Sequence, residues 1–350
     1  MVSSNMQAGL IYGPRDVRIE TVPVPEPASR EVLVKVDSVG ICASDIKKYT
    51  GFNKCKYPII LGHEFSGSII KVGSHVKGFQ VGDTVSANPD MPCFQCKYCR
   101  RSQYNLCTNL SVIGYGTEEI DPVNGAFAQY VKAPIWNLIK FSEISFDDAT
   151  YIEPLACVIR SFDQSKIQVG ENVIILGDGR IGLLHTQLAG ISGAKEIIIT
   201  GLTDSRLKLA SELGATTTIN VKTQDPLEYI KNNFEDGLDI VFDTTGIVSA
   251  AEQGPMMLAP HGRFIAFAGF KKGEFMKVNP RDLHYKEIVL TGSFGYGSID
   301  DYYKAAELIS TKRVIVDKIT TSLLLLGQLE DGFKELEELK SIRTIIHPNQ

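Results

Sequence analysis

The sequence lacks the long apolar run that a membrane-spanning helix requires. Such a helix needs about 20 mostly apolar residues, and the run at residues 323–326 is far too short. The opening residues, Met1-Val2-Ser3-Ser4-Asn5, also lack the apolar core of a signal peptide. We therefore expect a cytoplasmic protein with no membrane partner.

A basic block is missing as well. The chain of 350 residues has 36 Lys plus Arg and 41 Asp plus Glu, a formal charge of −5. This mildly acidic balance argues against nucleic acid or anionic lipid as the main partner. Internal repeats and low-complexity tracts are absent too. Because the length exceeds what a single hydrophobic core usually supports, two domains are expected.

What the sequence does contain is a cluster of cysteines. Four of its seven cysteines follow the spacing C-x₂-C-x₂-C-x₇-C and are Cys93, Cys96, Cys99 and Cys107. Four thiolates at this spacing can close a tetrahedral shell around Zn²⁺, which predicts a structural site with no open position. An iron–sulfur cluster is the competing functional interpretation. Four unpaired surface thiols with no function are the other alternative, and zinc is favoured over both.

A second candidate metal site combines different donors. Cys42 follows the apolar residues 32–39, and His63 and Glu64 stand side by side between Gly62 and Gly67. Sulfur, nitrogen and oxygen donors together suit Zn²⁺, and three protein ligands leave one position open for water or substrate. A core cysteine and an ordinary surface histidine are the alternative.

The second half of the chain changes to alternating strands and helices. Residues 172–176 are a short apolar run, Gly177-Asp178-Gly179-Arg180-Ile181-Gly182 follows at once, and residues 183–189 have helical character. Strand, glycine turn and helix in this order are the context of a dinucleotide-binding turn, where backbone amides approach a pyrophosphate. Further strands are expected at residues 196–200, 238–243, 263–268 and 288–292, with helices near 205–213, 226–234 and 248–258. Five such strands predict an α/β fold with a doubly wound parallel sheet.

Together these motifs resemble the zinc-containing alcohol dehydrogenase family of the medium-chain dehydrogenase/reductase superfamily. The resemblance is carried by residues 62–64 with Gly67, Gly73 and Val76, by the cysteine lobe, and by residues 125–130. Glu153 matches the sorbitol or polyol dehydrogenase-like branch, because classical members have a cysteine there. The family's order implies a GroES-like, mostly β catalytic domain over residues 1–155 and 293–350, a Rossmann domain over 156–292, and a homotetramer or dimer.

The resemblance also implies roles at the open metal site, and thus two zinc ions per chain. The candidate ligands of the catalytic zinc are Cys42, His63, Glu64 and Glu153. Glu153 is either a ligand or an outer partner of zinc-bound water. Ser44 would carry the substrate proton, and Asp45 would fix the tautomer of His63. Lys47 stands where family members often have a relay histidine, so proton exit runs through coenzyme ribose and water, or Lys47 contacts an anionic substrate.

Coenzyme choice depends on the end of the second Rossmann strand. Gly201 stands where an acid would bind the ribose hydroxyls of NAD, whereas Thr203 and Arg206 would contact the 2′-phosphate of NADP. Asp204 could restore NAD binding, and a solvated Arg206 is the ordinary alternative; NADP is slightly favoured over NAD. The expected coenzyme contacts are Gly177, Gly179, Arg180, Ile181, Gly182, Gly201, Thr203, Arg206, Gly269, Ser293 and Phe294.

The expected function is zinc-dependent hydride transfer between NAD(P) and a small-molecule polyol or sugar alcohol, phosphorylated ones included. The candidate pocket residues are Lys47, Tyr49, Tyr115 and Phe294. An L-threonine or simple secondary alcohol dehydrogenase is the alternative within the same class. From another class, a non-catalytic, zinc-stabilised dinucleotide-binding redox sensor would explain the cysteine lobe and the glycine turn. A methyltransferase explains neither cysteine set.

Overall fold

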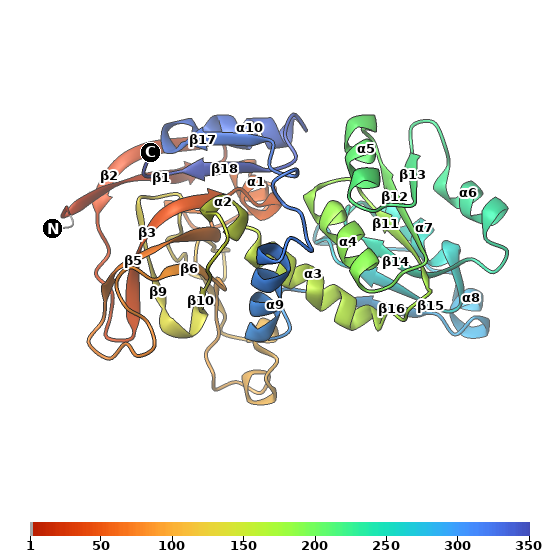
Figure 1. The fold of residues 1–350 in the computed structure, drawn as a ribbon, viewed down its shortest axis with the longest axis horizontal. Coiled ribbons are helices and arrows are strands. Elements are labelled where there is room, and N and C mark those ends of the chain that lie inside the picture. The colour runs from red at the N-terminus through yellow and green to blue at the C-terminus, as the bar shows by residue number, and fades with distance from the viewer. Residues whose placement is uncertain (1–2) are drawn as a thin grey trace. The chain divides into compact units, whose positions relative to one another are not determined.

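The computed structural model describes residues 3–350, which divide into two compact units (Figure 1). The first contains the chain up to Leu155 together with Gly297–Lys312 and Val316–Gln350. The second contains Ala156–Tyr296 and Arg313–Ile315. None of the helices in residues 3–350 is long and apolar enough to cross a membrane.

The first unit is mostly β. Its central strand is β3 (Glu31–Gly40), which pairs antiparallel with β5 (Glu64–Val72) inside a seven-stranded sheet of order β10-β6-β5-β3-β18-β17, with β9 also on β3. Smaller sheets are β2-β1-β4 and β7-β8. The remaining strands are β1 (Asn5–Gly13), β2 (Asp16–Pro23), β4 (Ile59–Ile60), β6 (Thr84–Ala87), β7 (Asp90–Met91), β8 (Ser111–Val112), β9 (Tyr130–Pro134), β10 (Leu138–Lys140), β17 (Ser322–Leu325) and β18 (Thr344–His347).

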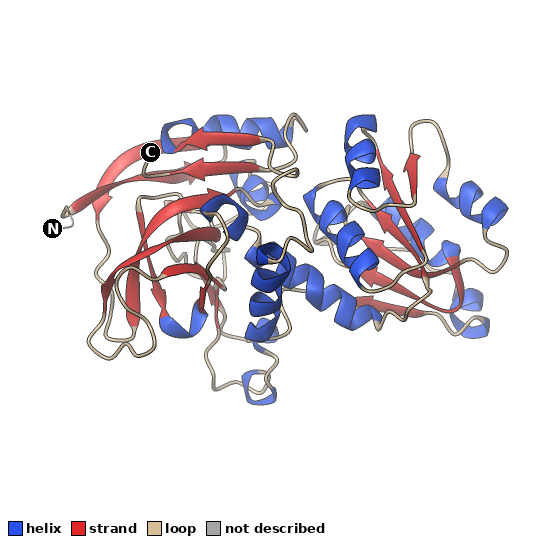
Figure 2. Ribbon diagram, viewed as in Figure 1, coloured by secondary structure: helices blue, strands red, loops and turns tan. Residues whose placement is uncertain are grey.

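Short helices join these strands (Figure 2). They are α1 (Ala43–Tyr49), α2 (Phe146–Ala149), α9 (Ile299–Ser310) and α10 (Leu329–Glu337), while α3 (Ile152–Ser165) begins in the first unit and continues in the second. The sequence predicts only a turn after Cys42. A helix forms because Asp45, three residues on, reaches back to the backbone N–H of Cys42 in a capping box.

The second unit is built on a six-stranded, fully parallel sheet of order β13-β12-β11-β14-β15-β16. Numbered within this unit, the order is 3-2-1-4-5-6, the arrangement of a dinucleotide-binding fold. The strands are β11 (Asn172–Leu176), β12 (Glu196–Gly201), β13 (Thr217–Asn220), β14 (Leu238–Asp243), β15 (Leu258–Ala266) and β16 (Val289–Gly292). The helices are α4 (Arg180–Ile191), α5 (Asp204–Glu212), α6 (Pro226–Asn233), α7 (Val248–Gln253) and α8 (Pro280–Tyr285).

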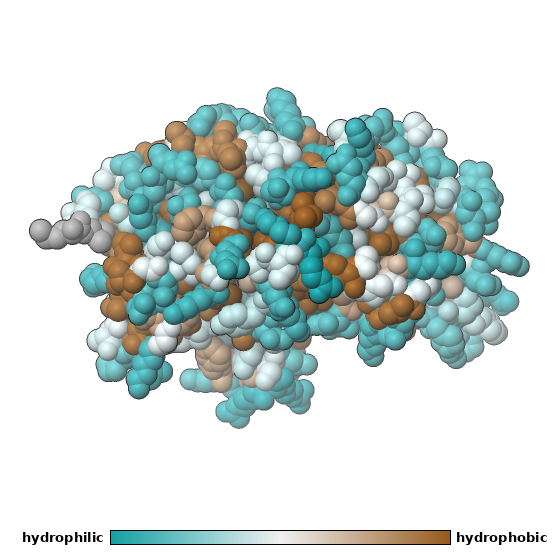
Figure 3. Space-filling model, viewed as in Figure 1, coloured by the Kyte–Doolittle hydropathy of each residue, from teal (hydrophilic) through white to brown (hydrophobic). Residues whose placement is uncertain are grey.

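Burial explains why these strands are continuous apolar runs rather than alternating ones. A parallel sheet is covered by helices on both faces, and Val173, Ile174 and Ile175 of β11 are all fully buried. On the face drawn in Figure 3, hydrophilic and hydrophobic residues are interspersed. The fold class expected from the sequence, a mostly β unit plus a doubly wound parallel sheet, is therefore confirmed.

Candidate active site

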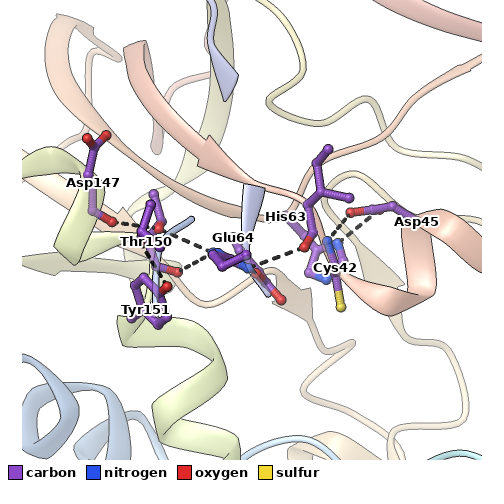
Figure 4. A network of polar contacts seen from close by, with 10 residues as sticks. Cys42, Asp45, His63, Glu64, Asp147, Thr150 and Tyr151 are labelled. Carbon is purple, nitrogen blue, oxygen red and sulfur yellow. Dashed lines mark hydrogen bonds and ion pairs between the residues drawn. The ribbon is translucent and has the colours of Figure 1, made fainter. Parts of the chain in front are cut away.

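One buried carboxylate positions the first two candidate metal ligands. Asp45 Oδ2 accepts a hydrogen bond of 2.9 Å from the backbone N–H of Cys42, which is the N-cap of α1. Asp45 Oδ1 lies 3.6 Å from Nδ1 of His63, the residue just before β5. Figure 4 shows Asp45, Cys42 and His63 grouped on one side of Glu64. Because Asp45 faces Nδ1, the ring atom of His63 that remains for a metal is Nε2.

Negative groups dominate the surroundings of His63. Its burial opposes the charged ring, but the charges of Asp45, Cys42 and Glu153 act the other way and raise the pKa of His63 well above its ordinary value. A ring with three anionic neighbours in a buried place is an environment suited to a divalent cation.

The donor atoms fit zinc. One ligand atom each from Cys42, His63 and Glu64 lies within 4.8 Å of the others. Ligands at about 2.1 Å from a tetrahedral zinc would be about 3.4 Å apart, so modest side-chain movement closes the shell. The buried Oγ of Ser44, two residues beyond Cys42, has no hydrogen-bond partner in the described chain. Its hydroxyl is therefore available to a group that enters the site.

Glu64 is also held by a residue that the sequence did not point to. The fully buried guanidinium of Arg343 donates from Nη1 to Oε2 of Glu64, and from Nη2 to Oγ1 of Thr150 at 3.2 Å. Gly40 makes room for Arg343, because a Cβ at residue 40 would lie 1.7 Å from Nη2. The available sequence signal was a charged residue directly before the short strand β18.

Glu153 lies in the first turn of α3, close enough for its charge to act on His63. It is not one of the three side chains whose donor atoms group within 4.8 Å. The structure thus places Glu64 in the compact donor group and Glu153 at its margin.

The four lobe cysteines lie together as the spacing predicts. Their donor atoms are mutually within 4.8 Å, and the sulfurs of Cys96 and Cys107 are 3.9 Å apart. Zn–S bonds of about 2.3 Å give a tetrahedral edge of about 3.8 Å. Backbone N–H groups point at the sulfurs, as in the 3.3 Å contact from Cys93 to Cys107 and the 3.4 Å contact from Cys96 to Cys93. This arrangement stabilises thiolates and is compatible with a closed zinc site.

The glycine turn of the second unit leaves space for a phosphate group. A Cβ on Gly182 would lie 1.9 Å from the carbonyl oxygen of Gly177, so only glycine fits where α4 crosses the turn. Gly179, the N-cap of α4, has nothing within 4 Å of its Cβ position. Arg180 and Ile181, both half-buried, open the helix. The turn therefore presents the start of a helix to open space, as pyrophosphate binding requires.

At the end of β12, a carboxylate from the glycine turn fills the space beside Gly201. Asp178, in the glycine turn, accepts hydrogen bonds at Oδ2 from the backbone N–H groups of Leu202 (3.0 Å) and Thr203 (3.1 Å). A Cβ on Gly201 would lie 2.3 Å from that carboxylate. The carboxylate of Asp178 thus occupies the place of a side chain at residue 201. Arg206 is only 9% exposed, so most of this residue is buried in the structure.

The other expected coenzyme residues follow the last two strands of the sheet. Ser293 is buried, its N–H donates to the Ala266 carbonyl at 3.0 Å, and its Oγ has no hydrogen-bond partner in residues 3–350. Phe294 is 64% exposed. The carbonyl oxygen of Gly269 packs against Gly246, whose Cβ would lie 2.9 Å from it.

The expected substrate-pocket residues behave differently from one another. Tyr49 is fully buried, stacks on Phe333 at 4.8 Å and donates its hydroxyl to Glu330 at 3.0 Å. It is a core residue, so its assignment to the pocket is wrong. Tyr115 is partly exposed, and its ring lies 3.9 Å from Nζ of the buried Lys48. Nζ of Lys47 lies 5.7 Å from the ring centre of Phe52.

This fold and these two metal-binding groups define a zinc-dependent dehydrogenase that uses a nicotinamide dinucleotide. Residues 28–143 match the alcohol dehydrogenase GroES-like domain model and residues 181–311 the zinc-binding dehydrogenase model. The chain belongs to the zinc-containing alcohol dehydrogenase family, in its sorbitol dehydrogenase-like branch, and is an oxidoreductase.

Three relatives illustrate the match. Sorbitol dehydrogenase of Bacillus subtilis is 34% identical over 100% of this chain and 99% of its own. A structure from Sinorhizobium meliloti, assigned as a zinc-binding dehydrogenase and bound to NADP, superposes with TM-score 0.93 at 29% identity, covering 99% and 100% of the two chains. The 2R,3R-butanediol dehydrogenase of B. subtilis gives TM-score 0.88 at 28% identity, covering 98% and 100%.

Proposed function

We propose that this protein interconverts a secondary hydroxyl of a polyol and the corresponding ketone, with NAD or NADP as hydride carrier. The observation that carries the proposal is a mixed group of donors, Cys42 and His63 with the carboxylate of Glu64, while the charge of Glu153 also acts on His63. This group differs from the closed four-cysteine lobe. When bound at the mixed group, Zn²⁺ supplies a Lewis acid that lowers the pKa of a hydroxyl group. The polyol class is supported by the similarity to the B. subtilis sorbitol and butanediol dehydrogenases.

The chain's own side chains orient the site and move the proton. Asp45 holds the backbone of Cys42 and faces His63, so both donors keep one geometry without substrate. The Oγ of Ser44 is buried without a partner in the described chain, and we assign it the first proton transfer from the substrate hydroxyl. Lys47, on the same helix, is the candidate for the next position on that path.

Two glutamates are candidates for the third protein ligand of the catalytic zinc. Glu64 belongs to the compact donor group but already pairs with Arg343, which offsets its charge. Glu153 is the residue that the family resemblance implies. We propose Glu153 as the ligand and Glu64 as the carboxylate that Arg343 holds beside it. Zinc content then falls further in Glu153→Gln than in Glu64→Gln; the reverse order would assign the ligand to Glu64.

The test of the proposed function combines metal content with initial rates. Wild type is expected to hold about two zinc ions per chain and to reduce coenzyme with free or phosphorylated polyols, with NAD and NADP assayed in parallel. His63→Ala should lose one zinc and all turnover, while His75→Ala, a change at an exposed histidine of the same unit, should keep both. Two bound zinc ions without turnover on polyols, threonine or simple secondary alcohols would favour the non-catalytic dinucleotide-binding protein.

We further propose a homo-oligomer formed through the second unit. Strand β16 ends the parallel sheet and, within the described chain, pairs only with β15. Its Val289 is 50% exposed, and Tyr285 and Leu283 of the preceding helix are 70% and 43% exposed. An apolar, unpaired strand edge is a template for pairing with another chain. Light scattering of the purified protein checks this, and a monomer at micromolar concentration contradicts it.

A cytoplasmic location is proposed from the thiol chemistry. Both metal groups need cysteines as thiolates, and all seven cysteines are free thiols in the structure. A reducing compartment preserves such thiols. Fractionation of the cells that make the protein tests the proposal.

A further inference from the structure

Asp90 is a carboxylate near the mixed donor group that the mechanism above does not use. It begins β7, and the backbone N–H of Ile113 in the neighbouring segment donates to the Pro89 carbonyl at 2.9 Å. The next residue, Gly114, crosses Gly62 so closely that a Cβ on it would lie 2.3 Å from the Gly62 carbonyl oxygen. Because His63 follows Gly62, this crossing ties the Asp90 segment to the histidine of the metal site.

The backbone around Asp90 is held firmly. The fully buried Asn137 donates from Nδ2 to the carbonyl oxygens of Asn88 (2.5 Å) and Asp90 (2.7 Å). The N–H of Asp90 donates to Oδ1 of Asn88 at 3.0 Å, and Tyr302 donates its hydroxyl to the same oxygen at 3.1 Å. The backbone that carries the Asp90 side chain is therefore fixed by buried contacts.

The carboxylate of Asp90 itself receives no hydrogen bond from residues 3–350. Burial raises its pKa to about 6, and the charge of His63 acts in the opposite direction. The charge of Asp90 in turn acts on Tyr115, together with that of Cys42. Asp90 is half-buried, and its carboxylate oxygens remain within reach of water or an added ligand. Its charge thus acts on both a metal-site residue and a candidate pocket residue, while its oxygens remain available to an added donor.

We propose that Asp90 accepts a hydrogen bond from a second hydroxyl of the substrate and thereby selects neutral polyols over phosphorylated polyols and over alcohols with one hydroxyl. The inference rests on the proposed function and adds a specificity residue to it. A fixed carboxylate is a strong acceptor for a hydroxyl donor. The same negative charge repels a phosphate group.

The basic side chain that lies over Tyr115, Lys48, does not favour an anionic substrate. Nζ of Lys48 is buried and lies over the ring of Tyr115, and burial lowers the pKa of this lysine. The charges of Cys55 and Asp45 have the opposite, smaller effect on the pKa of Lys48. Lys48 is thus buried among protein groups, whereas no residue of 3–350 donates a hydrogen bond to the carboxylate of Asp90.

The test uses substrates that differ by one hydroxyl: 2,3-butanediol and 2-butanol. In Asp90→Val, KM for the diol should rise on the order of 10- to 100-fold with a much smaller change in kcat, while kcat/KM for 2-butanol stays within about twofold. Asp90→Asn keeps an acceptor oxygen and should lie between Asp90→Val and wild type for the diol. Asp121→Asn, at a side chain 88% exposed in the same unit, is the control and should match wild type.

The outcomes separate this inference from the proposed function. If wild type turns over neither alcohol nor any polyol, the proposed function fails before Asp90 is tested. If Asp90→Val retains zinc but loses the diol and 2-butanol equally, Asp90 acts through the metal site and the inference is wrong. A wild-type preference for a phosphorylated polyol over its free form would also overturn it.

Discussion

A buried neutral histidine should make the second unit sensitive to acid. His185 lies inside α4, has no exposed surface and packs against Phe162 and Phe242 at ring distances of 5.7 and 4.9 Å. Its Nδ1 is 2.9 Å from the carbonyl oxygen of Ile181, and its Nε2 is 2.8 Å from Oγ of Ser161. Burial lowers the pKa of His185 to about 4. The ring is therefore neutral, with Nδ1 as donor and Nε2 as acceptor.

The sign and size of the effect follow from linkage. A histidine whose pKa is lower in the folded than in the unfolded chain contributes its full stability above the unfolded pKa of about 6.5. This contribution falls as the pH drops toward the folded pKa of about 4. A difference of about 2.5 pKa units corresponds to roughly 3 kcal/mol in the acid limit, and about 2 kcal/mol of that is lost by pH 5.

Urea unfolding of wild type and His185→Phe at about pH 7.5 and pH 5 measures this term. Phe keeps a ring among the aromatic neighbours but cannot bind a proton. Wild type should lose about 2 kcal/mol more of its unfolding free energy than the variant over this range. His284→Gln, a change at an exposed histidine of the same unit, should behave as wild type. If His185→Phe loses as much stability in acid as wild type, the buried imidazole is not the cause.

Three further predictions concern the coenzyme turn, the buried ion pair and the cysteine lobe. Asp178→Ser removes the carboxylate that fills the space beside Gly201. The ratio of kcat/KM with NADP to kcat/KM with NAD should therefore rise on the order of tenfold. An unchanged ratio would show that Asp178 does not influence binding of the coenzyme ribose. Arg343→Met should destabilise the first unit by about 3–5 kcal/mol because Glu64 is left buried without a guanidinium. Adding Glu64→Gln should recover part of that loss in urea unfolding, and an additive loss would contradict the pairing. Cys99→Ser should lower zinc by about one ion per chain and the melting temperature with it, whereas unchanged metal content would rule out a zinc lobe.

Periodicity predicted much of the second unit because its strands are buried on both faces. The runs at 172–176 and 196–200 became β11 and β12, since a strand covered by helices on both sides is apolar throughout. Strand β13 was missed. It is only four residues long, Thr217–Asn220, and two threonines and an asparagine leave no apolar run to recognise.

Spacing in the sequence predicted those parts of the site whose residues lie close together in the chain. Pairs of residues that are far apart in the chain could not be predicted. The four lobe cysteines lie within fifteen positions, so their grouping follows from sequence alone. Arg343 pairs with Glu64 across 279 positions, and no local pattern indicates such a pair. Tyr49 was wrongly assigned to the pocket because proximity to Cys42 in sequence says nothing about the side of α1 on which it packs.

Glycines show how the first unit brings its distant segments to one place. Gly62 precedes His63, Gly114 precedes Tyr115, and a Cβ on either Gly114 or Gly125 would lie 2.3 Å from the Gly62 carbonyl oxygen. The N–H of Ala126 donates to that same oxygen at 2.8 Å. Each glycine alone is consistent with an ordinary turn, and only their meeting shows that close backbone contact is required. The geometry of the metal site therefore rests on three backbone segments packed without side chains between them, so the smallest addition, a methyl group at residue 114 or 125, must displace the backbone that carries His63.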